Sequence, residues 1–152
     1  MDVIAFLNEL EELLKKMGYQ TARLDGEAPQ IGDTVRVMLP VDDEGNFVLL
    51  EVLAGEYNEE TLLIQIYTTM IAEIGPGYEA LKEMTLEWNL VCPIGAFGIY
   101  RQNRQFYHKY NYLLPTEGEP KDRAMEVFYV IHLIRDVIAE IFPDAVRLSG
   151  NG

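Results

Sequence analysis

The feature that most constrains the fold of this chain is a helix that ends at a Pro-x-Gly turn and is followed by a β-hairpin. The helical pattern ends in Glu87-Trp88-Asn89-Leu90, and the turn Pro93-Ile94-Gly95 follows it. Proline stops a helix because it has no N–H and its ring clashes with the preceding turn. The sequence therefore predicts a helix followed by two paired strands, over the ranges 78–92, 95–100 and 105–114.

Hydrophobic periodicity predicts the remaining elements. Apolar residues recur at helical spacing over 2–17 and over 120–142, where Pro143 is expected to mark the end of the helix. Alternating patterns between turn-rich segments predict strands, and the expected strands cover 19–24, 33–41, 47–54 and 61–71. The resulting order, α-βββ(β)-α-ββ-α, predicts an α+β protein in which three helices pack on one side of an antiparallel sheet of about five strands.

Length and composition predict a single domain, residues 1–148, followed by a frayed tail at 149–152. No apolar run approaches the roughly 20 residues that span a bilayer, and the charged N-terminal segment lacks the apolar core of a signal peptide. Cys92 is the only cysteine, so an internal disulfide is excluded. We therefore expect a cytoplasmic protein that does not bind membranes.

Charge is the second strong feature. The chain has 25 acidic residues against 12 basic ones, which gives a net charge of −13 at neutral pH. Such a surface repels phosphate backbones, so nucleic acid is not an expected partner. The same charge keeps a protein soluble, and it also attracts basic or partly unfolded polypeptides.

The order of the elements and three motifs resemble the YbjN-like sensory-transduction-regulator family, which shares its fold with the class I type III secretion chaperones. A leading amphipathic helix comes before three or more strands. The segment Glu87-Trp88-Asn89-Leu90 runs into Pro93-Ile94-Gly95-Ala96-Phe97, which is similar to the family's leucine and asparagine followed by a small turn with glycine and an aromatic residue. A hairpin that ends in Tyr112-Leu113-Leu114-Pro115 then leads to the terminal helix. Before the asparagine, where the family tends to have leucine, this chain has Trp88.

The resemblance implies a non-enzymatic, often dimeric protein that binds another polypeptide. Secretion chaperones hold a partner segment in extended form against the first helix and the sheet. The contacts implied for this chain are outward-facing apolar residues of the first helix and the early strands, namely Ile4, Leu13, Val35, Val37 and Val48. Recognition would combine strand addition at a sheet edge with side-chain pockets. The competing interpretation is that these residues fill the domain's own core.

Tyrosines of the second hairpin strand form another candidate surface for a partner or a second copy. Tyr110 and Tyr112 share one strand face with Phe106 and His108, whereas Tyr107 points to the other face. Aromatic side chains suit interfaces because they provide a large contact area at low entropic cost. One face must meet the helices, so half of this cluster is expected to belong to the core.

No set of residues predicts catalysis, a cofactor or a metal. His108 and His132 have no companion at metal-ligand spacing, and Cys92 is expected to be a packed thiol at a helix end. The segment Gly75-Pro76-Gly77 lacks the Lys-Ser/Thr pair of a phosphate loop. We expect a protein-binding module. The alternatives are a small-ligand sensor with a pocket between sheet and helices and, less favoured by the residues, an enzyme.

Overall fold

The structure, a computed structural model, describes residues 1–26 and 32–150. Its helices are α1 (Val3–Lys16), α2 (Tyr78–Val91) and α3 (Pro120–Ser149). Its strands are β1 (Thr21–Leu24), β2 (Thr34–Pro40), β3 (Phe47–Asn58), β4 (Thr61–Ile71), β5 (Ala96–Tyr100) and β6 (Gln105–Pro115). The predicted α+β class and order of elements are confirmed. The described residues form six strands rather than about five, because the short segment β1 pairs with β2 as a strand of its own.

The strands form one antiparallel sheet in the order β1-β2-β3-β4-β6-β5. β4 lies inside the sheet between β3 and β6. The two edges are formed by β1 and β5, which are the shortest strands and lie far apart in the chain. Short edge strands limit unwanted pairing with other chains.

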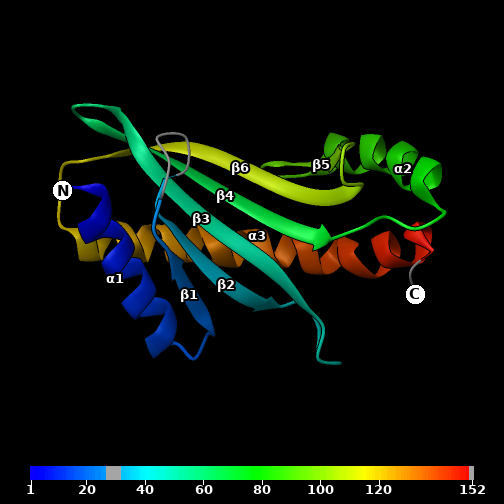
Figure 1. The fold of residues 1–152 in the computed structure, drawn as a ribbon, viewed down its shortest axis with the longest axis horizontal. Coiled ribbons are helices and arrows are strands. Elements are labelled where there is room, and N and C mark those ends of the chain that lie inside the picture. Colours follow the sequence, from blue (N-terminus) through cyan, green and yellow to red (C-terminus); the bar gives the residue numbers. More distant parts are fainter. Residues whose placement is uncertain (27–31, 151–152) are drawn as a thin grey trace.

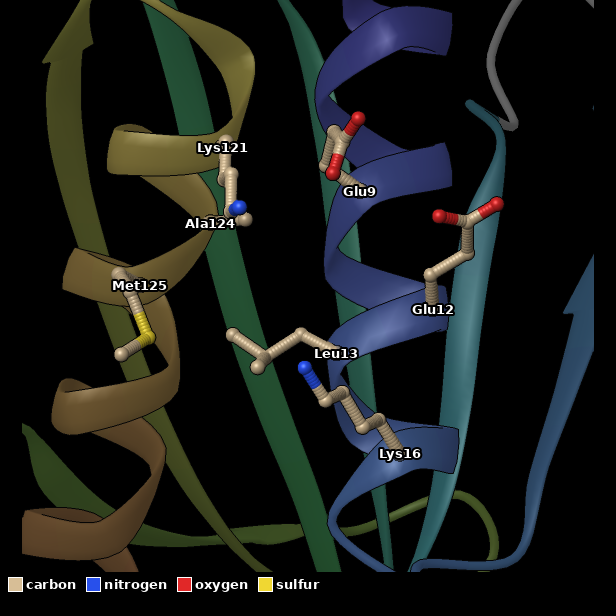
Figure 2. Close-up of a pocket in the computed structure, with 7 residues that line it drawn as sticks. All are labelled: Glu9, Glu12, Leu13, Lys16, Lys121, Ala124 and Met125. Carbon is tan, nitrogen blue, oxygen red and sulfur yellow. The ribbon is translucent and has the colours of Figure 1, made fainter.

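All three helices lie over one face of the sheet. α3 runs along the sheet, with α1 beside its N-terminal half and α2 near its C-terminal end (Figure 1). Figure 2 shows α1 and α3 side by side with strands of the sheet behind both. Alternate residues of each strand point toward these helices. The apolar core is formed by these strand residues, such as Leu50, Ile64 and Ile66, and by helix residues such as Phe6, Leu10 and Ile131.

The ends of α1 lie within one residue of the prediction. Asp2 caps the helix, since its Oδ1 accepts a hydrogen bond from the N–H of Ala5 at 2.7 Å. The chain leaves the helix before Gly18, which has a φ of 92°, a conformation that glycine adopts without strain. The apolar stripe of α1 is thereby placed against the sheet.

α3 extends beyond the end that Pro143 predicts, because it continues through this residue to Ser149. A proline inside a helix removes one backbone hydrogen bond, but contacts with the start of α2 hold the last turns in place. Ser149 is fully buried, its Oγ accepts a hydrogen bond from the N–H of Gly75, and its carbonyl oxygen accepts one from Gly77, each at 3.0 Å. The prediction of a frayed tail is therefore wrong for Ser149, and residues 151–152 lie outside the described residues.

An aromatic cluster joins α2 to the hairpin of β5 and β6. The ring centroids of Trp88, Phe97 and Phe106 lie between 5.8 and 6.2 Å apart. Gly95 begins the hairpin with a φ of 70°, and a Cβ there would lie 2.7 Å from the ring of His108. Trp88, Gly95 and Phe97 therefore belong to one packing motif with Phe106 and His108 of β6.

Candidate functional site

The strand residues predicted as partner contacts lie in the core. Val35 and Val37 are fully buried and Val48 is 3% exposed, and all three belong to the apolar cluster under the helices. The prediction that they face outward is wrong. Alternation along a strand separates two faces, but it does not identify which of them meets the helices.

Tyr110 and Tyr112 also lie on the helix-covered face of the sheet. They share it with the buried Phe106 and His108, as the sequence predicts. Their rings stack with centroids 5.4 Å apart, and burial raises the pKa of the Tyr112 hydroxyl. Both side chains are half-buried and pack against the apolar core. Their role as partner contacts stays a prediction.

Tyr67 and Tyr107 lie on the uncovered face, as does Tyr100, which pairs with Gln105. The rings of Tyr67 and Tyr107 stack with centroids 5.0 Å apart, and the Tyr67 hydroxyl donates a hydrogen bond to Oε1 of Gln105. Burial raises the pKa of Tyr67 to about 12. Tyr107 also lies over Gly98 of β5, where a Cβ would come within 2.5 Å of the tyrosine hydroxyl. Sequence reasoning missed Tyr67, although the alternation along β4 is a signal that could have placed it on this face.

The two predicted contacts on α1 point away from each other. About two and a half helical turns separate Ile4 from Leu13, so their side chains leave the helix in roughly opposite directions. Ile4 is 48% exposed, and Leu13 faces α3. The structure does not bring these residues together, and each has its own surroundings.

Leu13 lines a surface groove between α1 and α3 (Figure 2). The groove has a volume of ≈ 390 Å³. Its apolar lining comes from Leu13, Ala124 and Met125, and charged residues stand at its margins, namely Glu9, Glu12, Lys16 and Lys121. A groove of this composition can accept an apolar side chain while its margins contact charged neighbours of that side chain.

Ile4 lies on the flank of α1 that is next to β1. Ile4, Asn8 and Glu11 follow one another at i, i+4 and i+7 and so share one side of the helix. Asn8 contacts β1 directly, since its Oδ1 accepts a hydrogen bond from Nη1 of Arg23 at 3.1 Å. We call these three residues, together with Thr21 and Arg23, the β1 edge surface.

Every second residue of β1 directs its backbone N–H and C=O groups away from the sheet. The carbonyl oxygen of Gln20 accepts a hydrogen bond from the N–H of Met38 at 3.0 Å, which directs Gln20 toward β2. Backbone direction alternates along an antiparallel strand, so the N–H and C=O groups of Thr21 and Arg23 point outward. Among the described residues, no strand pairs with this edge.

Three buried polar atoms beside β1 have no hydrogen-bond partner within the described part of the chain. They are Oε2 of Glu11, Oγ1 of Thr21 and Nε of Arg23. A buried polar atom without a partner costs about 1–3 kcal/mol. The junction of α1 and β1 therefore holds an acceptor, a hydroxyl and a donor that a bound group could satisfy.

The opposite edge of the sheet is closed by a side chain. Asn89 of α2 accepts a hydrogen bond from the backbone N–H of Phe97 at 2.8 Å and donates one to its carbonyl oxygen at 2.9 Å. These are the groups that a further strand would use to pair with β5. The carboxamide thus takes the place of a neighbouring strand and protects the edge.

Replacing Asn89 with alanine is expected to lower the free energy of unfolding by about 1–3 kcal/mol, since two hydrogen bonds of about 0.5–1.5 kcal/mol each are lost. Chemical denaturation measures this value. Asn111, exposed on β6, is the matched control, and its replacement by alanine should change the free energy by less than about 0.5 kcal/mol. Equal losses from the two substitutions would contradict the role assigned to Asn89.

His108 and Cys92 bond to the same backbone oxygen. His108 Nε2 lies 2.8 Å from the carbonyl oxygen of Ile94, and Cys92 Sγ lies 3.2 Å from that oxygen. A carbonyl only accepts, so Nε2 carries the ring proton. His108 is fully buried, and this burial lowers its pKa. Both groups are therefore engaged in packing the turn, whereas His132 lies on α3 with its Nε2 3.3 Å from the hydroxyl of Tyr19.

The stability of the protein is expected to fall on acidification below about pH 6.5, the ordinary pKa of histidine. Because the folded state holds the pKa of His108 below that value, only the unfolded chain takes up this proton as the pH falls between the two pKa values. The free energy of unfolding then drops by up to about 1.4 kcal/mol per pH unit. Urea denaturation at several pH values measures the slope. His108→Gln keeps a donor for Ile94 and should give a shallower slope; an unchanged slope would rule out His108 as its source.

In residues 1–26 and 32–150, no group of three or more His, Cys, Asp or Glu side chains is arranged to hold a metal ion. No helix in these residues combines the length and apolar character needed to cross a membrane. Comparison with known proteins gives no match to a protein-family model and no significant match to a curated protein.

Proposed function

We propose that this chain is a non-enzymatic polypeptide-binding module that holds an extended segment of its partner as an added strand on β1. The observation that supports this most is the difference between the two edges of the sheet. The side chain of Asn89 occupies the outward backbone groups of Phe97 in β5, whereas the outward backbone groups of both Thr21 and Arg23 in β1 have no side chain of the described residues bonded to them. An unblocked edge strand is a template for pairing, and strand addition is a recurrent mode of peptide recognition.

Main-chain pairing alone is too weak to hold a partner. Thr21 and Arg23 offer two N–H and two C=O groups, and each hydrogen bond contributes about 0.5–1.5 kcal/mol. Association costs at least about 4 kcal/mol in lost translational and rotational freedom. Side-chain contacts must supply the remainder, and they also determine which sequences bind.

The flank of α1 supplies these side-chain contacts. Alternate residues of an added strand point toward α1, where Ile4 offers an exposed apolar surface. Two turns further along α1, the unpartnered atoms of Glu11, Thr21 and Arg23 suit a polar side chain that both donates and accepts hydrogen bonds. The β1 edge surface therefore fits a segment in which an apolar residue and a polar residue both face α1.

The groove lined by Leu13 offers a second, separate contact on the other side of α1. An apolar side chain from a more distant part of the same partner fits its lining. The net charge of −13 favours partners with basic or neutral segments. The resemblance to secretion chaperones agrees with this arrangement, since it implies an extended partner against the first helix and the sheet.

The test begins with affinity capture from lysate of the source cells, followed by identification of the retained polypeptide and synthesis of its bound segment. Hydrogen exchange is then compared with and without the segment. The amides of Thr21 and Arg23 should exchange rapidly in the free protein and become protected in the complex. Protection confined to β5 or α2 would contradict the proposal.

Two substitutions test the edge without disturbing the fold. Thr21→Pro removes an outward N–H and leaves the pairing of β1 with β2 intact. Ile4→Asp adds a carboxylate in the first turn of α1, where the helix dipole favours it. Each should weaken binding of the segment at least about tenfold, which corresponds to 1.4 kcal/mol. Leu90→Asp, at an 80% exposed position on α2, is the control and should bind as the unmodified protein does.

A further inference from the structure

The face of the sheet opposite the helices carries several large apolar side chains among its polar ones. Solvent-facing sides of antiparallel sheets are ordinarily polar, and a contiguous apolar patch indicates an interaction site. Here the residues that face away from the helices include Met38, Leu49, Leu53, Leu63, Tyr107 and Leu113. We call this surface, together with Arg36, Glu51, Tyr67 and Lys109, the open face.

The register of the strands arranges the open face in rows. One row crosses β2, β3, β4 and β6 through Arg36, Glu51, Tyr67 and Lys109. The row on one side of it consists of Met38, Leu49, Thr69 and Tyr107. On the other side, the adjacent row consists of Thr34, Leu53, Gln65 and Asn111. Beyond that row, Leu63 and Leu113 pair across β4 and β6. The charged row thus has an apolar row on one side and a mixed row on the other.

We propose that the open face packs against the open face of a second copy of this chain. The two copies are related by a two-fold axis that lies between the two sheets and runs parallel to β4, over Tyr67. Such an axis exchanges the strands on the two sides of β4, so that β6 of one copy lies over β3 of the other. Lys109 then faces Glu51 of the partner subunit, and Tyr107 faces Leu49 of the partner subunit one row away. The face is thus complementary to itself in charge at Lys109 and Glu51, and in apolar character at Tyr107 and Leu49.

Charge explains why two strongly acidic chains can meet here. The chain as a whole carries −13, but the charged residues in the rows of the open face are two bases and one acid. Arg36 Nε lies 3.0 Å from Glu51 Oε2 within each copy. The symmetry of the contact adds two ion pairs, each between Lys109 of one copy and Glu51 of the other. No acid at the centre of the contact then lacks an opposite charge.

The size of the open face also fits a second copy. The stated axis overlays five strands, since β1 has no counterpart on the far side of β4. Five strands spaced about 4.8 Å apart and four rows spaced about 6.8 Å apart give about 24 Å by 27 Å, an area on the order of 600 Å² for each copy. A standard stable interface buries about 800 Å² for each partner.

The central side chains are held in place before any contact forms. Tyr67 is fixed by its hydrogen bond to Gln105 and by stacking on Tyr107, so little side-chain freedom is lost on association. The second copy covers a face of the sheet and leaves the edge of β1 free. This inference therefore goes beyond the proposed function, and either one can hold without the other.

Sedimentation equilibrium with charge-reversal variants tests the proposal. The unmodified protein is expected to have the mass of two chains at tens of micromolar. Lys109→Glu and Glu51→Lys each place like charges opposite one another and should weaken association at least about tenfold. An equal mixture of the two variants should restore the dimer, because both opposing pairs then become attractive. Lys82→Glu on α2 is the matched control and should associate as the unmodified protein does.

Circular dichroism and thermal unfolding first establish that the variants remain folded. Restoration of the dimer only in the mixture supports the stated axis, because a general loss of structure would not be repaired by mixing. A protein that stays monomeric at all concentrations overturns the proposal. So does a dimer that neither charge reversal weakens, a mixture that fails to restore it, or a dimer that is lost when Leu90 of α2 is changed to Asp.

Discussion

Replacement of Phe106 by alanine is expected to lower the free energy of unfolding by about 3–5 kcal/mol. Phe106 is fully buried where α2, β5 and β6 meet, and its ring centroid lies 6.1 Å from that of Trp88 and 5.8 Å from that of Phe97. The surrounding groups are held by a helix and by paired strands, so they cannot move far enough to fill the cavity. The loss is a large part of the roughly 5–15 kcal/mol by which a domain is stable.

Urea denaturation followed by tryptophan fluorescence measures this loss, because Trp88 lies beside the altered side chain. Phe47 provides a matched control, since it is also a strand phenylalanine but is 53% exposed. Its replacement by alanine should cost less than about 1 kcal/mol when the protein is dilute. A loss below about 1.5 kcal/mol for Phe106→Ala would show that the cluster is not a firm part of the core.

Replacement of Gly77 by alanine should cost about 3 kcal/mol or more. A Cβ at this position would lie 1.6 Å from the backbone carbonyl oxygen of Leu148, so the start of α2 and the end of α3 would have to separate. Overpacking of this kind costs about 1–3 kcal/mol. Separation would also break the hydrogen bonds from Gly75 and Gly77 to Ser149, each of which contributes about 0.5–1.5 kcal/mol.

Gly55 of β3 is the control for this substitution. A Cβ added there would meet no atom within 4 Å, so Gly55→Ala should leave the free energy of unfolding unchanged or slightly raised. Thermal unfolding of the two variants gives the comparison directly. If both alanines are tolerated equally, the close contact between α2 and α3 is absent in solution, and the frayed end of α3 that the sequence predicts is then correct.

The contact at Gly77 also explains why the sequence misplaced the end of α3. Proline at 143 is a local signal to end a helix, and the free-energy cost of placing it inside a helix is real. The last turns are nevertheless helical because Ser149, which lies beyond that proline, is buried against Gly75 and Gly77. These partners are far apart in the chain, so no local pattern could reveal them.

The candidate site was predicted only in part. Ile4 and Leu13 do lie at surfaces, because an amphipathic helix shows its exposed flanks in its periodicity. The valines at 35, 37 and 48 are in the core, because a strand with apolar residues on both faces does not indicate which face is covered. The closing of the β5 edge by Asn89 was not predicted, although the asparagine itself was noted in the motif.

By itself, the sequence determined the class of the fold, the order of its helices and strands and the position of most of their ends. Those properties follow from periodicity, from turn residues and from capping, which act between neighbours in the chain. The tertiary structure alone decided which face of the sheet is left open, which edge is free and where α3 ends. Those properties depend on contacts between segments far apart in the sequence, and the free energy of such contacts outweighs the local preferences of the residues that make them.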